Sequence, residues 1–349
     1  MKYRVLLIGT SNGVFVDGYA SAFEAHPAIS DFKNISLGGS TNVMLPYRLT
    51  GVNLADYDMV FIETGIHDAA AMKRGAYLES QMTAVFHWIT AECKKAGALP
   101  VGIILPPQYS DLFPRTAELT RQAFGGVCLD LSTVMHEFDG AWSDPSHVSK
   151  PLAIALITAF LDEVFKLDIK DLWKYVPDAA EYSFSFVSLR ENPAAQMGMI
   201  RSAPVTTRLV EDVAYCVMEG QEFHVDLDSA AMLAALVVNR FDTRCVLEIT
   251  GARSIMKDMR FQIADRPGVI MNVAALSVPL EAQGNGRFTF RVQEPVLDIT
   301  HMAPPDRMQI TGIVVQRPTG HAASTSGEMY NSAPMVERVM RSLRHPAEV

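Results

Sequence analysis

The sequence predicts an α/β protein in which a doubly wound parallel sheet fills the N-terminal half and an antiparallel β-sandwich follows. Two observations lead to this fold class. Up to about residue 167, short apolar strands alternate with helical segments, the order that builds a parallel sheet with helices on its faces. From about residue 198, short strands separated by turns replace this pattern, as is typical of sandwich and jelly-roll domains. The 349 residues suffice for two domains.

The first half opens with an apolar strand at 3–8 that ends at Gly9. Short apolar runs bounded by glycine indicate buried parallel strands. We expect further strands at 34–37, 58–64, 100–106 and 127–131. Helical patterns and helix-ending residues predict helices at 14–25, 77–96, 117–124 and 151–165.

The second half contains eight expected strands, at 213–218, 222–227, 232–239, 245–250, 259–263, 269–278, 287–292 and 309–316. Turn residues at 265–268 and 284–286 separate some of them. We therefore place an α/β domain at 1–167, a connector at 168–194, the β-sandwich at 195–320, and a flexible segment with a C-terminal helix at 321–349. One face of that helix is apolar and comprises Met335, Val336, Val339, Met340 and Leu343. We expect this face to dock on the parent domain or on a neighbouring subunit. A homo-oligomer is therefore one of the open alternatives.

Composition excludes several classes of partner. The net charge of −9 argues against nucleic acid or an anionic membrane surface, and no apolar run reaches the ~18–20 residues of a membrane span. Because the first expected strand begins at residue 3, we expect no signal peptide. The four cysteines lack a Cys-x-x-Cys pair, so we expect free thiols and a cytoplasmic location. In the second half, His224 and His301 stand alone without metal-ligand spacing, and we expect no cofactor.

A candidate nucleophile, Ser11, follows Gly9 at the expected carboxyl end of the first strand, where open α/β sheets place ligands and chemistry. Such a serine alone is more often a helix cap. Asp144 and His147 change this interpretation, because a carboxylate three residues from an imidazole can fix its tautomer and stabilise the imidazolium. A serine nucleophile needs such a base at neutral pH, and the order serine, aspartate, histidine occurs in hydrolases.

Two further strand ends carry groups that could stabilise an oxyanion. Gly38 and Gly39 follow the expected strand at 34–37 and allow a backbone N–H to approach a ligand closely. His67 follows the strand at 58–64. The N–H groups of Ser11 and Gly39 and the side chain of His67 could converge on the oxygen that becomes negative during acyl transfer. Taken singly, a tight turn and a surface imidazole would explain them.

Four short blocks in this order resemble the SGNH (GDSL-type) hydrolases over about residues 1–170. They are Gly-Thr-Ser-Asn at 9–12, Gly-Ser-Thr at 39–41, Gly-Ile-His-Asp at 65–68 and Asp-Pro-Ser-His at 144–147. The resemblance implies a flavodoxin-like α/β/α sandwich and a catalytic triad of Ser11, Asp144 and His147. It also implies that the backbone of Gly39 is an oxyanion donor.

The chain departs from the family pattern at two positions. Thr10 stands where an acidic residue usually precedes the nucleophile, and that residue supports the turn more than the chemistry. His67 stands where the family has its asparagine. An imidazole N–H can also donate to an oxyanion, but the ring is larger and can titrate, so the geometry of the hole and its pH dependence are expected to differ.

These observations predict a serine esterase that acts on a small acyl ester through an acyl-serine intermediate, with an acetylated carbohydrate as the substrate class that the resemblance implies. Two alternatives stay open. The same triad would serve an O-acyltransferase of glycan biosynthesis, since hydrolysis and transfer differ only in the second acceptor. A catalytically weak or inactive glycan-binding protein is the other. A nucleotide-binding domain is disfavoured because neither Gly-x-Gly-x-x-Gly nor a P-loop is present.

Overall fold

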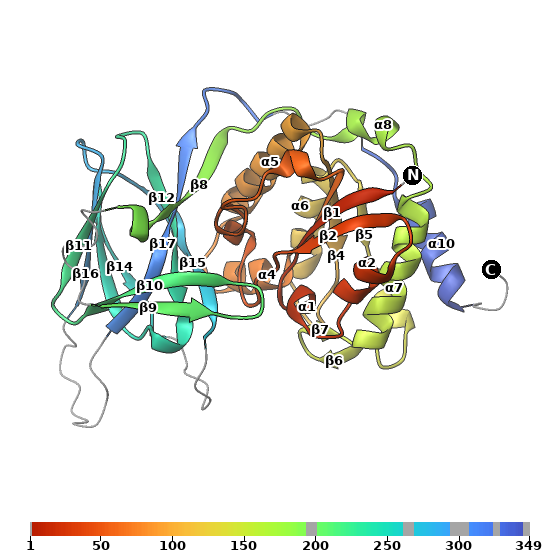
Figure 1. The fold of residues 1–349 in the computed structure, drawn as a ribbon, viewed down its shortest axis with the longest axis horizontal. Coiled ribbons are helices and arrows are strands. Elements are labelled where there is room, and N and C mark those ends of the chain that lie inside the picture. Colours follow the sequence, from red (N-terminus) through yellow and green to blue (C-terminus); the bar gives the residue numbers. More distant parts are fainter. Residues whose placement is uncertain (1, 193–200, 261–268, 294–306, 324–328, 345–349) are drawn as a thin grey trace. The chain divides into compact units, whose positions relative to one another are not determined.

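In the computed structural model, residues 2–192, 201–260, 269–293, 307–323 and 329–344 are described (Figure 1). The chain forms two compact units. The first combines Met1–Tyr182 with Thr319–Val349, and the second is Ser183–Pro318. The sequence analysis placed boundaries at 167, 194 and 320. The second unit begins at Ser183, inside the range expected as a connector, and the last helix lies within the expected range 321–349 but belongs to the first unit.

The first unit is built on a five-stranded parallel sheet in the order β2-β1-β3-β4-β5. Nearly every residue of β1, β3 and β4 is buried, which explains their continuous apolar sequences. The chain runs from β1 outward to β2 and then returns to the other side of β1 as β3. The carboxyl ends of β1 and β3 therefore form a topological switch point, where ligands bind in such sheets. The strands are β1 Tyr3–Ile8, β2 Ile29–Asn34, β3 Met59–Glu63, β4 Leu99–Ile104 and β5 Cys128–Asp130. The strand expected at 34–37 was therefore misplaced, because β2 ends at Asn34 and residues 35–37 follow it outside any strand.

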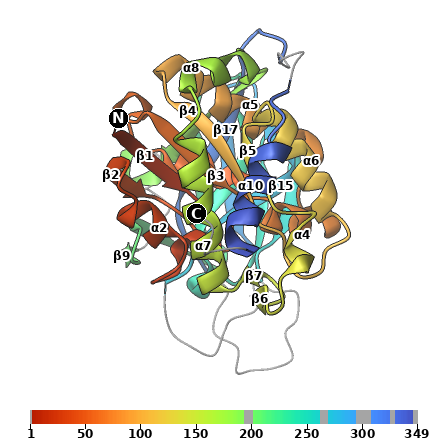
Figure 2. The same cartoon turned by 90° about the vertical axis from the view of Figure 1, so that its right-hand side faces the viewer.

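Helices cover both faces of this sheet, which confirms the predicted α/β/α architecture. Helices α2, α7 and α10 pack on one another on one face, and α4, α5 and α6 lie on the other (Figures 1 and 2). A short hairpin, β6 (Trp142–Asp144) and β7 (His147–Val148), precedes α7. The helices are α1 Ser11–Val14, α2 Ala20–Ala25, α3 Leu45–Arg48, α4 Ile66–Lys73, α5 Glu79–Ala96, α6 Phe113–Ala123, α7 Lys150–Val164, α8 Ile169–Leu172 and α10 Ala333–Arg344.

The single helix expected at 14–25 is in fact two, α1 and α2, separated by a turn. Asp17 has a left-handed φ of 54°, and the N–H of Gly18 donates to the carbonyl of Phe15 at 3.2 Å. A left-handed residue cannot continue a helix. The turn places Phe15 and the exposed Val16 beside the start of α7, where the ammonium of Lys150 donates to the carbonyl of Val16 at 2.8 Å.

The C-terminal helix α10 belongs to the first unit although the second unit precedes it in the chain. Its apolar face packs on α7, and Arg338 pairs with Glu163 of that helix. The buried face comprises Met335, Val336, Val339 and Met340, which share one core with β1, β3 and β4. The amphipathic stripe seen in the sequence is thus a core-facing stripe.

The second unit is an antiparallel β-sandwich, as predicted. One sheet has the order β15-β12-β17-β10-β9, with β8 also paired to β17, and the other has the order β11-β16-β13-β14. Phe223 and Phe290 stack with ring centroids 4.7 Å apart inside the apolar core. The strands are β8 Tyr182–Ser188, β9 Arg201–Thr206, β10 Glu211–Met218, β11 Glu222–Asp226, β12 Met232–Asn239, β13 Val246–Thr250, β14 Ser254–Asp258, β15 Met271–Glu281, β16 Arg287–Val292 and β17 Arg307–Pro318.

Several details of the second half differ from expectation. Strand β8 lies inside the range expected as a connector, and β9 and β14 were not expected at all. The expected strand at 259–263 begins at Met259, which with Arg260 lies outside any strand, while 261–263 lie outside the described residues. The expected turn at 265–268 also lies outside them.

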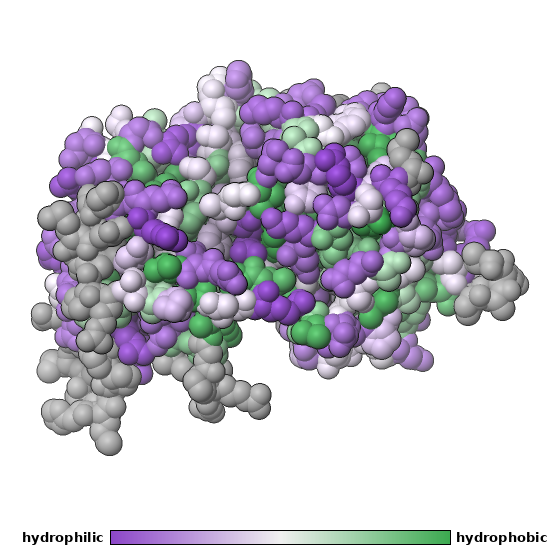
Figure 3. All heavy atoms as spheres, viewed as in Figure 1, coloured by the Kyte–Doolittle hydropathy of each residue, from purple (hydrophilic) through white to green (hydrophobic). Residues whose placement is uncertain are grey.

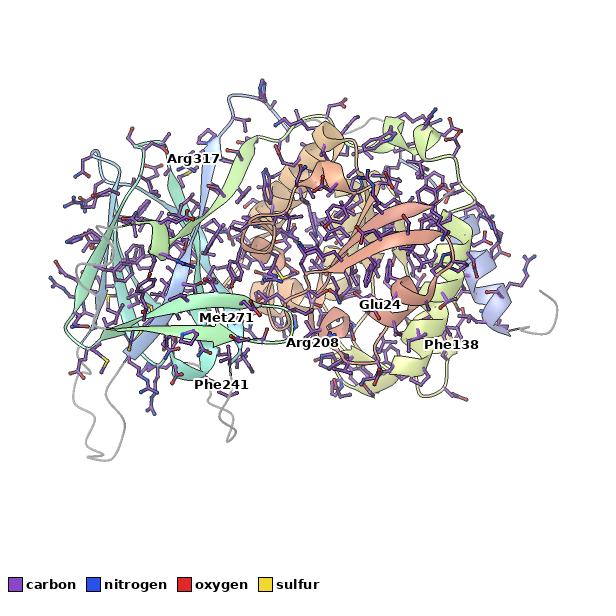
Figure 4. The ribbon with its side chains drawn as sticks, viewed as in Figure 1. Glu24, Phe138, Arg208, Phe241, Met271 and Arg317 are labelled. Carbon is purple, nitrogen blue, oxygen red and sulfur yellow. The ribbon has the colours of Figure 1, made fainter. Side chains whose placement is uncertain are left out.

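Hydrophilic residues cover much of the face drawn in Figure 3, with smaller hydrophobic clusters between them. Within each unit, side chains fill the space between the layers (Figure 4). None of the helices in the described part of the chain combines the length and the apolar character needed to cross a bilayer.

Candidate active site

Three side chains that the sequence analysis singled out form a hydrogen-bonded chain. Ser11 lies at the carboxyl end of β1, where α1 begins, and its Oγ is 2.8 Å from Nε2 of His147. The other ring nitrogen, Nδ1, lies 2.7 Å from Oδ2 and 2.9 Å from Oδ1 of Asp144. These distances are those of ordinary hydrogen bonds. Residues 133 positions apart in the chain are thus brought together at the switch point of the sheet.

The β6–β7 hairpin holds the carboxylate in place. Oδ1 of Asp144 accepts the backbone N–H groups of Ser146 at 2.8 Å and His147 at 3.1 Å, so the turn is organised around this side chain. The hairpin is fastened to the segment after β4, because the indole N–H of Trp142 donates to the carbonyl of Pro106 at 2.9 Å. Burial alone would raise the pKa of Asp144, but hydrogen bonds from His147 and the turn backbone hold it below its usual value.

The direction of each proton follows from the donors and acceptors present. An ionised carboxylate only accepts, so Nδ1 of His147 carries a proton toward Asp144. In the neutral imidazole, Nε2 is then an acceptor and takes the hydroxyl proton of Ser11. This arrangement can activate a serine hydroxyl for attack on a carbonyl carbon.

His67 approaches the same hydroxyl from α4. Its Nε2 lies 3.5 Å from Oγ of Ser11, at the outer limit of a hydrogen bond. Because the single hydroxyl proton points to His147, a hydrogen bond between this pair requires Nε2 of His67 to be the donor. The position is suited to an N–H that stabilises negative charge next to the serine.

The glycine loop after β2 lies against the serine. A Cβ atom added to Gly38 would stand 3.6 Å from Cα of Ser11 and 3.8 Å from its Cβ. Gly39, the next residue, has a left-handed φ of 72°, which favours glycine. The structure therefore places the residue directly before the second sequence block against the nucleophile. The sequence analysis proposed five site residues: Ser11, Gly39, His67, Asp144 and His147. The side chains of four of them, all except Gly39, are linked by the distances given above.

Phe15 was missed by the sequence analysis. Its ring meets the His147 imidazole edge-on, with centroids 4.9 Å apart, and Lys150 Nζ lies 5.5 Å from the ring centroid of Phe15. Packing against this ring helps to fix the imidazole plane, in addition to the Asp144 hydrogen bond. No sequence signal identified it, because the expected helix at 14–25 would have turned this side chain elsewhere.

Two fully buried carboxylates lie behind the site, and their roles also went unrecognised. Burial raises the pKa of Glu63 at the end of β3, against the hydrogen bonds from Thr10 that lower it. Burial likewise raises the pKa of Asp68 to about 6, although it accepts backbone N–H groups of Asn42 and Gly65. A signal for Glu63 was present, since an acidic residue closing an otherwise apolar buried strand must have partners.

A separate cavity of about 470 Å³ runs along α10, between that helix and the segments around β5. Its lining includes the ion pairs Arg121–Asp130 and Arg344–Glu137, and none of the five predicted site residues. This cavity is therefore distinct from the site formed by Ser11, His147 and Asp144. Among the residues with described positions, no group of three or more His, Cys, Asp and Glu side chains is arranged to hold a metal ion.

Comparison with known proteins supports the fold assignment. No protein-family model and no curated protein sequence matches the chain. The crystal structure of a two-domain esterase (CEX) active on acetylated mannans is similar over 91% of this chain and 92% of that chain, with a TM-score of 0.61 and 14% identity. The structure of a two-domain esterase of the same description, co-crystallised with mannopentaose, matches over 91% of both chains with the same score and identity. The psychrotrophic esterase EstA from Pseudoalteromonas sp. matches over 47% of this chain and 99% of that chain, with a TM-score of 0.37 and 16% identity.

The first unit thus has the predicted flavodoxin-like α/β/α fold, and the β-sandwich is inserted in the chain before the last helix of that unit. The two-domain match spans both units of the chain, so the combination of folds, and not the α/β unit alone, is shared with a known protein. At 14% identity this likeness concerns the fold.

Proposed function

We propose that the protein is a serine esterase that hydrolyses a small acyl ester through an acyl-serine intermediate. The observation that carries this proposal is the hydrogen-bonded chain from Ser11 through His147 to Asp144 at the switch point of the sheet. A hydroxyl, a base and a carboxylate in this order are the machinery of nucleophilic acyl transfer. The blocks that resemble the SGNH hydrolases point to the same residues.

In the proposed mechanism, Nε2 of His147 takes the hydroxyl proton as Oγ of Ser11 bonds to the carbonyl carbon of the ester. The carbonyl oxygen becomes negative and is held by the N–H groups of Ser11 and Gly39 and by His67. Asp144 stabilises the imidazolium. As the tetrahedral intermediate collapses, the bond to the alcohol breaks and His147 protonates the leaving oxygen.

The second half of the reaction repeats these steps with water. His147 removes a proton from a water molecule, whose oxygen attacks the acyl-serine carbonyl. The bond to Oγ of Ser11 then breaks, and His147 returns the proton to the serine, which releases the acid. An acceptor hydroxyl in place of water would make the same site an O-acyltransferase, so the two reactions differ only in the species admitted at this step.

For the substrate, we propose an acetylated carbohydrate. The support is the fold likeness over both units to an esterase described as active on acetylated mannans. The short acyl group and the sugar are tested together by two panels, p-nitrophenyl esters from acetyl to decanoyl and a set of acetylated sugars. A preference for long acyl chains would overturn the carbohydrate assignment and leave an esterase of another class.

The proposal itself is tested with p-nitrophenyl acetate. We expect Ser11→Ala to reduce kcat by at least about 1000-fold. The matched control is Ser80→Ala, an exposed serine of α5, which should behave like the wild type. Equal turnover by the wild type and Ser11→Ala would refute the nucleophile. No turnover by the wild type on any ester, together with binding of the unmodified glycan, would favour a glycan-binding protein without esterase activity.

A further inference from the structure

Glu63 lies directly behind the turn that presents the candidate nucleophile. It closes β3, is fully buried, and sits beside β1 in the sheet. Oε2 accepts the backbone N–H of Thr10 at 2.7 Å, and the hydroxyl of Thr10 donates to Oε1 at 2.9 Å. The hydroxyl of Tyr19 donates to the same carboxylate at 3.4 Å. A buried carboxylate is costly unless such donors surround it, and here most of them come from Thr10, the residue before Ser11.

The end of β2 and the segment after it hold the same turn from the other side. Oγ of Ser36 accepts the N–H of Gly9 at 2.8 Å and donates to Oδ1 of Asn34 at 2.6 Å. The amide of Asn34 donates in turn to the carbonyl of Gly13 at 2.9 Å. The turn from Gly9 to Gly13 is therefore fixed at three backbone groups by side chains from the end of β3, the end of β2 and the segment after β2.

These contacts determine the direction of the Ser11 N–H. The peptide before Thr10 is fixed because its N–H donates to Glu63, and the peptide after Thr10 is fixed because its carbonyl accepts the N–H of Gly13 at 3.1 Å. The second of these peptides carries the N–H of Ser11. A peptide group is planar, so fixing its carbonyl also fixes its N–H. With both neighbouring peptides held, little freedom is left for the serine backbone or for the Cα–Cβ bond that aims Oγ.

No other residue type would fit easily at the ends of this turn. A Cβ on Gly9 would lie 2.6 Å from the Tyr19 hydroxyl and 3.0 Å from Oε2 of Glu63. A Cβ on Gly13 would lie 2.4 Å from Oγ of Ser36. Both glycines are thus required by the side chains that hold the turn, and their place in the sequence is explained by Glu63 and Ser36.

We propose that Glu63 is a positioning residue for the nucleophile. From the end of β3 it supplies the carboxylate that orients the turn, and Thr10, the residue before the serine, binds this carboxylate through its N–H and its hydroxyl. This inference rests on the proposed function. It assigns Glu63 no contact with the substrate, so its loss should lower the rate of serine acylation and leave substrate binding nearly unchanged. A misplacement of reacting groups by about 1 Å costs on the order of 100-fold in rate.

The test is Glu63→Gln, which keeps the size of the side chain but removes the charge and one acceptor. We expect kcat for p-nitrophenyl acetate to fall about 10- to 100-fold while KM changes less than about twofold. Labelling of Ser11 by an alkyl fluorophosphonate, which reports the same attack without an alcohol leaving group, should slow by a similar factor. The matched control is Glu24→Gln, an exposed glutamate of α2 (Figure 4), which should label like the wild type.

A second pair of variants decides the matter if Glu63→Gln does not fold, as judged by its melting temperature. Thr10→Val removes only the hydroxyl that donates to Glu63, and Thr10→Ser keeps it. We expect Thr10→Ser to label faster than Thr10→Val.

The outcomes separate the two hypotheses. A wild type that is not labelled at Ser11 refutes the proposed esterase and this inference with it. A labelled wild type with equally fast labelling of a folded Glu63→Gln, or of both Thr10 variants, refutes the inference alone. A change in KM without a change in labelling rate would also overturn it, because it would place Glu63 in substrate binding.

Discussion

Asp68 connects the two loops that carry the candidate oxyanion groups, and replacing it with asparagine tests that connection. Its buried carboxylate accepts the N–H of Gly65, where the helix bearing His67 begins, at 2.9 Å. It also accepts the N–H of Asn42, three residues after Gly39, at 2.8 Å. An asparagine side chain has one oxygen to accept from these two backbone N–H groups. Its NH₂ group would face the second N–H, which would then have no acceptor. Leaving one buried donor without a partner costs about 1–3 kcal/mol.

The pH dependence of the free energy of unfolding tests the role of Asp68 more sharply than the destabilisation caused by Asp68→Asn at a single pH. Burial raises the pKa of Asp68 from 3.8 to about 6. Between these values the folded protein binds more protons than the unfolded chain, so the free energy of unfolding falls as the pH rises from about 4 to about 6. The contribution is fully present below pH 4 and lost above pH 6. The difference between the two pKa values corresponds to about 3 kcal/mol.

Urea unfolding followed by tryptophan fluorescence would measure this pH dependence for the α/β unit, which contains Asp68. All three tryptophans, Trp88, Trp142 and Trp173, belong to the α/β unit. As the pH rises from 4 to 7, the free energy of unfolding of the wild type should fall by about 3 kcal/mol more than that of Asp68→Asn. Asp111→Asn, at a side chain that is 90% exposed, should follow the wild type. Parallel stability curves for the wild type and Asp68→Asn would show that this carboxyl titrates normally and would refute the reasoning.

Two further predictions concern the site and the last helix. His67→Asn should retain most of the kcat/KM for p-nitrophenyl acetate because it keeps a side-chain N–H, whereas His67→Ala should lose about 2–4 kcal/mol of transition-state stabilisation. The exposed His136→Ala is the control, and wild-type rates in both His67 variants would make this imidazole a bystander. Val339→Asp puts a charge into the core beneath α10 and should lower the unfolding midpoint of the tryptophan signal markedly. Glu337→Ala, on the exposed side of α10, should leave that midpoint nearly unchanged, and an equal effect of the two variants would contradict the packing of α10.

The sequence sufficed for those parts of the site whose evidence is local. Asp144 and His147 are three residues apart in one turn, and Ser11 ends a strand that is recognisable from its own apolar run. Glu63 could not be assigned in this way. Its partners, Thr10 after β1 and Tyr19 before α2, are more than 40 residues away, and their contact depends on β3 lying next to β1. Sequence patterns identify strands, but the order of strands in a sheet follows from packing that they do not encode locally.

The fold was predictable to a similar extent. β12 and β16 have the expected bounds because each is a continuous strand between clear turns. β8 has the alternating sequence Tyr-Ser-Phe-Ser-Phe-Val-Ser, which is a strand pattern with period two. It nevertheless lies inside the range 168–194 that the sequence analysis assigned to a connector. The missed turn between α1 and α2 depends on the left-handed Asp17, which local propensity does not anticipate.

The β-sandwich is an insertion in the α/β unit and not an appendage at its end, and this changes how the α/β unit must be studied. The chain leaves the unit at residue 182 and returns at residue 319. The two crossings are tied, because Thr319 donates its N–H to the carbonyl of Glu181 at 2.9 Å and its hydroxyl to the carbonyl of Ala180 at 2.6 Å. The returning chain then forms α10, which covers α7, the helix that begins three residues after His147.

The packing of α10 therefore supports the helix that follows the candidate general base. Deleting the chain after residue 182 would remove four buried apolar side chains of α10 and expose the face of α7 that they cover. Exposing that much apolar surface costs several kcal/mol at about 25 cal/mol per Å². A loss of activity in such a truncated chain would then reflect the missing helix, and could not be read as a catalytic role of the sandwich. The function of the second unit is better tested by substitutions on its own surface, with residues 319–344 kept in place.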